Sequence, residues 1–152
     1  MNKLIKVGHI GWVVQDIDKS KELFTKFLGL RDWIVYDMAP PKLHDSTCYG
    51  EKVEHSFRIA SAPLGGFTLE LIMPLKGKNV YSEFLKEKGE GLHHVGLTPF
   101  ESDQELELVK EEYVSQGGKV IQSGRNQKEK GISHYYYIEK DALVLEMFYS
   151  PK

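Results

Sequence analysis

The pattern of apolar and polar positions divides the chain into two similar series of elements. The first series opens with an Ile- and Val-rich run that predicts a buried strand over 4–14. Apolar residues then recur at helical spacing and predict a helix over 19–28, which Gly29 is placed to end. A loop is expected over 38–52, where Pro and Gly gather. Three further apolar runs predict strands: 33–36, 57–60 and 67–73.

The predicted helix of this first series has a start signal and an apolar face. Asp18 or Ser20 is suited to cap it, because a short polar side chain can accept a hydrogen bond from the first free backbone N–H groups. The expected apolar face consists of four residues: Leu23, Phe24, Phe27 and Leu28. We expect these residues to pack on the sheet.

The same order of elements returns after a linker over 75–90, which carries a short helical pattern of its own. An apolar run predicts a strand over 92–98, and helical spacing predicts a helix over 103–116 that ends before two glycines. A basic loop is expected over 124–131. Three more strands complete the second series: 119–121, 134–138 and 142–149.

This repetition predicts an α+β fold made of two tandem βαβββ modules that form a curved mixed sheet around a cleft. The modules cover about 4–74 and 91–150, and we treat 1–152 as a single domain. Such a length is ordinary for one domain with a shared core.

Each series places a histidine two residues before a glycine at the head of an apolar strand, His9 before Gly11 and His94 before Gly96. Each also closes with a glutamate inside an apolar strand: Glu70 and Glu146. Alternate strand residues share a face, so we expect each glycine to leave room beside its histidine for an ion or ligand.

The spacing of these residues supports a duplication. The two histidines are 85 positions apart and the two glutamates 76, so one gap of nine residues, 85 less 76, relates the two series. We assign this gap to the loop over 38–52, which is longer than its counterpart over 124–131.

Two histidines and two buried-looking glutamates together predict a metal centre. A strand histidine on its own is more often a hydrogen-bonded core residue, and a lone glutamate is more often salt-bridged. A buried carboxylate without a partner is costly, however, and a cation would offset that cost. The donor types suit Zn, Ni, Co, Mn or Fe(II). The predicted ligands are four: His9, Glu70, His94 and Glu146.

The remaining histidines and the cysteine receive weaker assignments. His93 is one position out of phase with His94 and is expected to pack or to support a ligand. We expect His44 and His55 to be solvated, and His134 is a further residue that could reach the pocket. The single cysteine lies in a polar stretch and is interpreted as an incidental free thiol: Cys48.

Composition narrows the functional classes. A net charge of −2 disfavours nucleic-acid binding, and no apolar run approaches the roughly 18 residues of a membrane span. The first six residues are too charged for a signal peptide, and a single cysteine excludes an internal disulfide. We therefore expect a cytoplasmic protein that acts on a small molecule, with no nucleic-acid or membrane partner.

These residues resemble the vicinal oxygen chelate superfamily, which includes glyoxalase I, bleomycin-resistance proteins, extradiol dioxygenases and methylmalonyl-CoA epimerase. The resemblance covers nearly the whole chain and is sharpest to the epimerase-like branch. It rests on three segments: 9–20, 68–75 with the short helix after it, and Gly-Leu-His-His-Val at 91–95. It implies a glyoxalase-like fold and ligands at the four positions already named. Epimerases often have glutamine where Glu70 stands, whereas glyoxalase I commonly has glutamate.

The resemblance implies a metal-dependent isomerase or epimerase that acts at the carbon α to a carbonyl, with the metal stabilising an enolate. In some epimerases a catalytic carboxylate stands where this chain has Arg58. Either Glu54, four residues earlier, supplies the base, or Glu70 or Glu146 does so by loosening from the metal. Arg58 would then pair with a substrate carboxylate.

Rival functions share parts of this ligand set. A glyoxalase I-type lactoylglutathione lyase needs the same four ligands and would take a hemithioacetal instead of an acyl-CoA thioester. Bleomycin-resistance proteins generally lack the full set, so the four intact ligands count against that class. Ring-cleaving dioxygenases use two His and one Glu with Fe(II), so the extra Glu70 disfavours them. The predicted cofactor is a divalent Zn, Ni, Co or Mn ion, and we expect a homodimer. Charges in such loops are more often simply solvated, but five basic residues are candidates to meet the phosphates of CoA: Lys76, Lys78, Arg125, Lys128 and Lys130.

Overall fold

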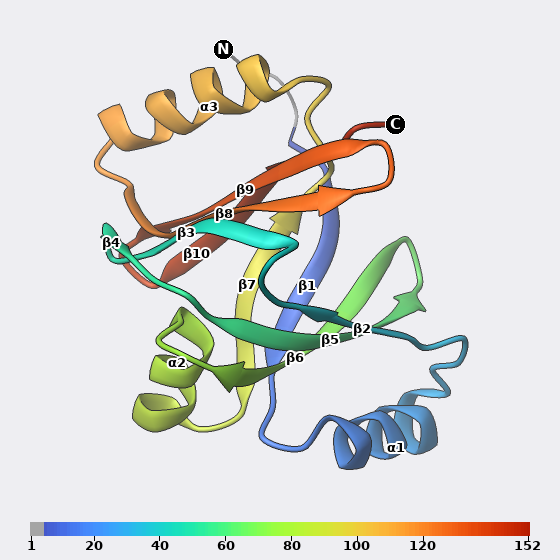
Figure 1. The fold of residues 1–152 in the computed structure, drawn as a ribbon. Helices are drawn as coiled ribbons and strands as arrows, with labels where there is room; N and C mark the ends of the chain where they lie inside the picture. Colours follow the sequence, from blue (N-terminus) through green and yellow to red (C-terminus); the bar gives the residue numbers. More distant parts are fainter. Residues whose placement is uncertain (1–4) are drawn as a thin grey trace.

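The computed structural model describes residues 5–152, so the first residue of the strand predicted over 4–14 lies outside it. Three helices lie outside one curled sheet, within the described part of the chain (Figure 1). The first half comprises β1 (Val7–Val13), α1 (Ile17–Leu28), β2 (Ile34–Met38), β3 (Leu43–Cys48), β4 (Glu51–Lys52), β5 (Ser56–Leu64) and β6 (Phe67–Lys76). After α2 (Val80–Lys88), the second half comprises β7 (Gly91–Leu97), α3 (Asp103–Ser115), β8 (Lys119–Lys128), β9 (Gly131–Lys140) and β10 (Leu143–Tyr149).

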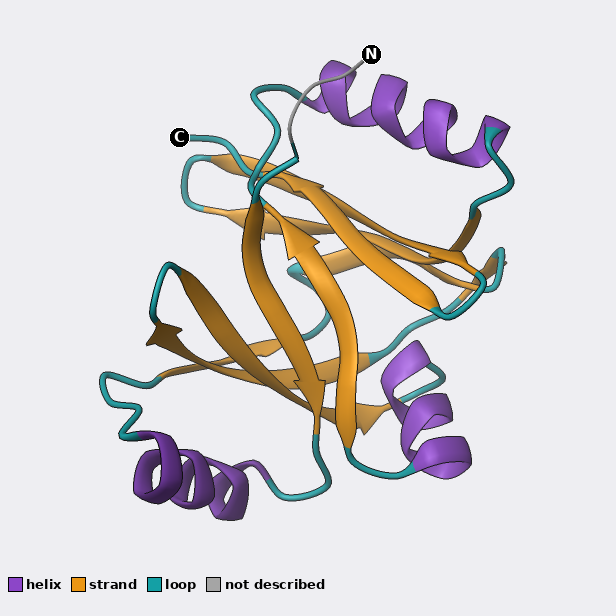
Figure 2. Ribbon diagram, turned by 180° about the vertical axis from the view of Figure 1, so that it is seen from behind, coloured by secondary structure: helices purple, strands orange, loops and turns teal. Residues whose placement is uncertain are grey.

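The sheet places the two halves edge to edge. Its strand order is β2-β5-β6-β1-β7-β10-β9-β8-β3-β4. In each half the first strand pairs in parallel with the last, β1 with β6 and β7 with β10, while β1 and β7 pair antiparallel and join the halves (Figure 2). The predicted α+β fold, two tandem βαβββ modules in a curved mixed sheet, is therefore confirmed.

The loop predicted over 38–52 contains two strands, β3 and β4. The strand β3 pairs antiparallel with β8 of the other half, and its terminal residues Leu43 and Cys48 are buried. The sequence between these two residues is polar and shows no apolar alternation. The prediction was wrong because this strand forms by backbone pairing with a strand distant in sequence, which local composition does not reveal.

The basic loop predicted over 124–131 is also wrong. Strands β8 and β9 continue to Lys128 and from Gly131, so only a tight turn separates them. Their ladder extends to the pair Lys128 and Gly131, and Gly131 has a positive φ of 136°. Polar side chains at a hairpin end can be solvated on both faces, and the apolar signal of a strand is then missing.

Helix α1 begins earlier than predicted. Asp16 is its cap, because its carboxylate accepts hydrogen bonds of 3.1 Å from the backbone N–H groups of Asp18 and Lys19, so neither Asp18 nor Ser20 has this role. Gly29 ends the helix as predicted, in a left-handed conformation with φ 69°. Its N–H donates to the carbonyl oxygen of Thr25.

The apolar face predicted for α1 is largely exposed. Phe24 packs on the cluster beneath the helix, whereas Leu23, Phe27 and Leu28 are 53%, 76% and 56% exposed. Ile17 and Ser20 are the residues of this helix that are buried. The helix therefore contacts the sheet along a narrower line than its apolar composition indicates.

The core consists of apolar clusters on both sides of the curled sheet. One lies beneath α1 and one beneath α3, and a third fills the inside of the curl and includes Tyr81, Tyr135 and Tyr137. Cys48 belongs to this inner cluster as a buried free thiol, and burial raises its pKa. Within residues 5–152 no helix is long and apolar enough to cross a bilayer.

Candidate metal centre

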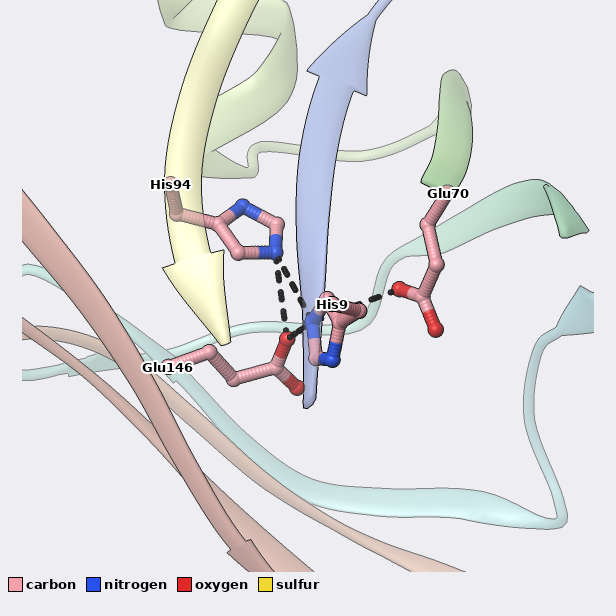
Figure 3. Close-up of side chains that lie close together, drawn as sticks. All are labelled: His9, Glu70, His94 and Glu146. Carbon is pink, nitrogen blue, oxygen red and sulfur yellow. Dashed lines mark hydrogen bonds and ion pairs between the residues drawn. The ribbon is translucent and has the colours of Figure 1, made fainter. Parts of the chain in front are cut away.

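Four side chains converge from four adjacent strands at the middle of the sheet: His9 from β1, Glu70 from β6, His94 from β7 and Glu146 from β10. One ligand atom of each lies within 4.8 Å of those of the other three (Figure 3). The inward-facing geometry predicted from the repeat is thus present in the structure. The two halves each contribute one imidazole and one carboxylate, and β1 and β7 bring them together.

Reciprocal glycines make this convergence possible. In the β1–β7 ladder His9 lies opposite Gly96, and His94 lies opposite Gly11. A Cβ atom at Gly96 would lie 2.0 Å from Cε1 of His9, and one at Gly11 would lie 2.0 Å from Cε1 of His94. The expected space for an ion beside each glycine is therefore filled by the imidazole of the other half. Any side chain larger than hydrogen would displace a ring.

Three of the four ligand atoms are close packed. The Oε2 atom of Glu146 lies 2.8 Å from Nε2 of His9 and 3.2 Å from Nε2 of His94, and the two Nε2 atoms are 3.3 Å apart. Ligand atoms about 2.1 Å from one ion lie roughly 3.0–3.4 Å from one another, depending on the coordination geometry. The separations between these donors therefore fit a small divalent cation, and the imidazole and carboxylate donors suit Zn, Ni, Co or Mn.

Glu70 is the outlying member of the cluster. Its Oε2 atom is 3.5 Å from Nε2 of His9, farther than Glu146 is from either imidazole. Burial raises the pKa of Glu70 to about 7; the charge of Glu146 also raises it, while the charges of His9 and Lys128 oppose the shift. Near neutral pH this carboxyl group is therefore poised between its acidic and basic forms.

The charges of the other three groups shift one another's pKa values. Burial disfavours a charged His9, but the charge and hydrogen bond of Glu146, with the charge of Glu70, outweigh it and raise the pKa of His9 to about 9. The histidines outweigh burial at Glu146 and hold its pKa far below the ordinary value. Burial, together with the charge on His9, lowers the pKa of His94. A proton on His9 thus occupies the electrostatic position that a metal cation would take.

Neighbouring side chains orient the ligands. The hydroxyl group of Tyr81 donates to Tyr137 over 2.7 Å, and the hydroxyl group of Tyr137 donates to Oε2 of Glu146 over 3.1 Å. His93 packs against the rings of Tyr81 and Phe84, as its phase predicted. The sequence analysis assigned neither tyrosine to the site. A signal was visible for Tyr137, which lies in a run of three consecutive tyrosines, 135–137.

His93 also contacts a ligand directly. Its Nδ1 atom lies 2.9 Å from Nδ1 of His94, so one of the two rings donates a hydrogen bond to the other. Burial and the neighbouring His94 lower the pKa of His93 to about 3, which keeps His93 neutral. A bond donated by Nδ1–H of His94 would leave its Nε2 lone pair directed at the centre.

The four-residue cluster lies at the wall of a cavity of about 240 Å³. Three of the four candidate ligands line it, and two of these are carboxylates, whereas β7 with His94 contributes no lining residue. The residues that line it, besides His9, Glu70 and Glu146, are Tyr36, Met38, Phe57, Ile59, Tyr81, Asn126, Lys128, Ser133, His134, Tyr135, Tyr137 and Phe148. The cavity gives a small molecule access to the cluster.

Comparison with known proteins identifies the family. The profile of the Glyoxalase/Bleomycin resistance protein/Dioxygenase superfamily matches residues 8–136, which include His9, Glu70 and His94. This chain belongs to that superfamily. A relative, Uncharacterized protein YqjC of Bacillus subtilis (strain 168), is 30% identical over 129 residues, which is 85% of this chain and 80% of the relative. Members of the superfamily commonly use divalent metals, in agreement with the donors found here.

Solved structures share the whole fold. Hypothetical protein BH1468 from Bacillus halodurans C-125 has a TM-score of 0.66 at 20% identity, covering 99% of this chain and 97% of that one. Methylmalonyl-CoA epimerase from Mycobacterium tuberculosis has a TM-score of 0.66 at 19% identity, covering 99% and 93%. The Streptomyces coelicolor epimerase in complex with 2-nitronate-propionyl-CoA has a TM-score of 0.68 at 16% identity, covering 97% and 99%. At these identities the comparison shows a glyoxalase-like fold.

Two of the predicted site residues, Glu54 and Arg58, do not lie beside the four-residue cluster. Glu54 is exposed, lies before the start of β5 and does not line the cavity. Arg58 is on β5, but Phe57 and Ile59 on either side face the cavity, so its side chain is on the other face. There the guanidinium donates to Asp37 of β2 over 2.6 Å.

Two further histidines, His55 and His44, lie away from the four-residue cluster and do not line the cavity. His55, expected to be solvated, is only 2% exposed, because it packs on Phe57 and its Nδ1 bonds the carbonyl oxygen of Lys78. His44 is partly exposed and pairs with the adjacent Asp45.

His134 borders the cavity, but its imidazole faces α3. There its Nδ1 atom lies 2.8 Å from Asp103 and 3.6 Å from Glu107. Arg125 and Lys110 pair with these two carboxylates, so the charges of this second cluster are already balanced.

The basic residues expected to meet phosphates separate into two groups. Lys128 lines the cavity. The others do not line it, and two of them are engaged elsewhere, Arg125 with Asp103 and Lys78 with Glu51. The residues away from the cavity are Lys76, Lys78, Arg125 and Lys130.

Proposed function

We propose that this protein is a metal-dependent isomerase or epimerase that acts at the carbon α to a carbonyl group, in the manner of methylmalonyl-CoA epimerase. The observation that carries the proposal is the unequal set of donors around one point. His9, His94 and Glu146 are packed within 3.3 Å of one another, while Glu70 stands 3.5 Å from the nearest of them. Three groups are thus arranged to hold an ion, and the fourth is a looser donor at the same site.

In this proposal His9, His94 and Glu146 hold the divalent ion, with Glu70 as a fourth, looser ligand. A bound divalent cation supplies a Lewis acid that stabilises negative charge on a carbonyl oxygen. Glu70, the outlying donor whose Oε2 atom lies 3.5 Å from Nε2 of His9, removes and returns the α-proton. The apolar side chains around the cavity keep water from the reacting carbon.

An acyl-CoA thioester is the proposed substrate. Support comes from the fold shared with epimerases solved in complex with 2-nitronate-propionyl-CoA and with methylmalonyl-CoA. A hemithioacetal, as in a glyoxalase I-type lactoylglutathione lyase, is the second candidate. It is favoured by the carboxylate at position 70, because the resemblance associates glutamate there with glyoxalase I and glutamine with epimerases.

The test is exchange of the α-proton. The purified protein is stripped of metal, reloaded with Zn, Ni, Co or Mn, and incubated in ²H₂O with methylmalonyl-CoA or with the hemithioacetal of methylglyoxal and glutathione. We expect deuterium at the α-carbon of methylmalonyl-CoA or at the hydroxyl-bearing carbon of the lactoylglutathione product, read by mass spectrometry, and the substrate that incorporates it decides between the two reactions. A metal-loaded protein that exchanges neither substrate contradicts the proposal.

Two matched variants sharpen this test. Glu70→Gln should lower exchange by about 10²–10⁴-fold, the usual loss when a general base is removed. Glu54→Gln removes an exposed carboxylate that does not line the cavity and should leave exchange unchanged. Equal rates in the two variants would exclude Glu70 as the base.

We further propose that the protein works as a homodimer in the cytoplasm, with its single cysteine kept reduced. Support for the dimer comes from β2, which ends the sheet and carries Ile34, Val35 and Tyr36 at 65%, 45% and 41% exposure. An apolar strand edge of this kind is usually covered. Light scattering of the purified protein measures the mass directly, and a strict monomer would exclude the dimer.

A further inference from the structure

The two walls of the cavity differ in chemistry. The first half contributes Tyr36 and Met38 from β2 and Phe57 and Ile59 from β5, all of which present carbon-rich side chains. The second half contributes aromatic side chains from β9 and β10 and, near the end of the β8–β9 hairpin, three polar side chains: Asn126, Lys128 and Ser133. Asn126 and Ser133 are paired across the β8–β9 ladder. The cavity is therefore apolar along β2 and β5 and has a polar wall at the end of the β8–β9 hairpin.

Lys128 is the cation of the polar wall. Its Nζ atom lies 3.1 Å from Oγ of Ser150. Within residues 5–152 no carboxylate lies within 4.0 Å of this ammonium group. The lysines at positions 78, 110 and 152, in contrast, each have a glutamate within that distance. A cavity-lining cation without an ion-pair partner among the described residues is available to an anion.

The charges around the cavity favour such an anion. The carboxylates of Glu70 and Glu146 would repel a negative substrate in the metal-free protein, but a divalent ion compensates both of them. Lys128 then leaves the loaded cavity with a net positive charge. A neutral donor accompanies it, since the amide of Asn126 lies on the same wall and can donate to a carboxylate. The hydroxyl group of Ser133 donates to the backbone carbonyl oxygen of Asn126 over 3.3 Å and adds polarity to this wall.

The volume limits what can enter. A cavity of about 240 Å³ corresponds to roughly eight water molecules at about 30 Å³ each. It therefore accommodates a compact group of a few carbon and oxygen atoms, and a nucleotide-bearing carrier would remain outside it.

We propose that Lys128 is a specificity-determining residue, which with the amide of Asn126 binds a carboxylate on the substrate while another oxygen of the substrate faces the metal centre. The inference rests on the proposed function and extends it: the substrate is a compact carboxylic acid, or the acidic acyl end of a larger molecule. Its carbon substituent packs against the wall formed by Phe57 and Ile59. The carboxylate at one end of the substrate and the apolar substituent at its side together determine which molecules bind.

Binding of two probes of equal size tests the assignment. Succinic monohydroxamate carries a hydroxamate, which binds metal ions, and a free carboxylate at its other end, whereas its amide replaces that carboxylate with a neutral group of equal size. Both are titrated into cobalt-loaded protein at pH 7.5, and the visible absorption of the cobalt centre is recorded. We expect the wild type to bind the carboxylate probe about tenfold more tightly than the amide probe.

The variants separate this effect from others. Lys128→Gln should bind both probes with the affinity that the wild type has for the amide probe, and Lys128→Glu should favour the amide probe. Lys130→Gln, on the same hairpin but not on the cavity wall, should keep the tenfold preference. Cobalt affinity, measured by chelator competition, should be equal in all four proteins because none of these positions contributes a ligand.

Each other outcome contradicts one claim. A wild type without the preference, or a Lys128→Gln protein that retains it, overturns the role of Lys128 while leaving the metal-dependent function intact. A wild type that does not bind cobalt overturns the proposed function, and the carboxylate site with it. A loss of affinity for both probes in Lys128→Gln would show a general effect on the cavity and also overturn the assignment.

Discussion

Glu70 and Glu146 occupy equivalent positions in the two halves, yet their surroundings differ. Across the ladder, Glu146 lies opposite Tyr137, whose hydroxyl group donates to it, and both imidazoles are within 3.2 Å of it. Glu70 lies opposite Ser61, and within residues 5–152 the two form no hydrogen bond. Both halves contain the carboxylate, but the residue opposite it on the neighbouring strand differs. Glu146 therefore accepts a hydrogen bond from that residue, whereas Glu70 does not.

The pKa shifts of the two carboxylates differ in the same way. Burial raises the pKa of Glu70, whereas the two histidines overcome burial and lower that of Glu146. Separate pKa values for two similar groups usually mark separate roles in acid–base chemistry. A symmetric fold thus carries an asymmetric site, and four changes test how far this asymmetry extends.

The largest effect is expected from filling either reciprocal glycine. Gly96→Ala and Gly11→Ala each place a Cβ atom 2.0 Å from a ring carbon of the opposite histidine, so the imidazole must move. We expect metal affinity to fall by more than about 100-fold, and the free energy of unfolding to fall by about 1–3 kcal/mol, as in other overpacked sites. Chelator competition and urea unfolding measure the two quantities.

Gly66→Ala is the control for this pair, because nothing lies within 4 Å of an added Cβ atom there. If the two site variants bound metal like this control, the histidine rings would not need the space that the glycines leave.

The second effect compares the carboxylates themselves. Glu146→Gln should lower metal affinity by at least about 100-fold, since loss of a ligand should exceed the 10–100-fold typical for loss of an outer partner. Glu70→Gln should lower it by no more than about tenfold, because Glu70 is the outlying donor. Isothermal titration with zinc gives both values. Equal losses would mean that the two carboxylates are equivalent ligands.

The third effect is the pH dependence of the metal-free protein. The pKa of His9 is raised from 6.5 to about 9, so its protonation stabilises the fold fully below pH 6.5, and this contribution is lost as the pH rises through 9. The loss is on the order of 3 kcal/mol, because one pKa unit corresponds to about 1.4 kcal/mol. Urea unfolding between pH 6 and pH 9.5 measures it.

The two histidines should oppose each other in this experiment. His9→Asn should flatten the decline, whereas His94→Asn should keep it, because the pKa of His94 is lowered and its contribution is lost only as the pH falls. Metal affinity should rise with pH up to about 9, since the ion must displace the proton of His9. An affinity that does not vary between pH 6 and pH 9 would contradict the raised pKa.

The smallest effect concerns the hydroxyl group that distinguishes the two carboxylates. Tyr137→Phe removes the 3.1 Å hydrogen bond to Glu146 and should lower metal affinity by about tenfold. Ser61→Ala makes the matching change beside Glu70 and should have no effect. Zinc competition assays on both proteins provide the comparison, and equal affinities in the two would show that Tyr137 does not orient its ligand.

Much of the fold could be predicted because the repeat is visible in local patterns. Apolar runs identified the strands that pair within each half, and Gly29 identified the end of α1. The strands β3 and β4 were missed because β3 is stabilised by pairing with β8, some 75 residues away in sequence, and its own residues are polar. Leu23 and Phe27 show the opposite case: their apolar spacing predicted that they pack on the sheet, but both are exposed.

The site follows the same division. The sequence by itself determined the four donors, because a histidine before a glycine and a glutamate in an apolar strand recur at matching places in both halves. Only the tertiary structure decided that Gly11 and Gly96 accommodate the rings of the opposite half, that Arg58 turns away to Asp37, and that Tyr137 holds one carboxylate while Glu70 remains loose. The physical reason is that the type of each residue can be read from the sequence, whereas the residues that it contacts depend on which strands pair across the sheet.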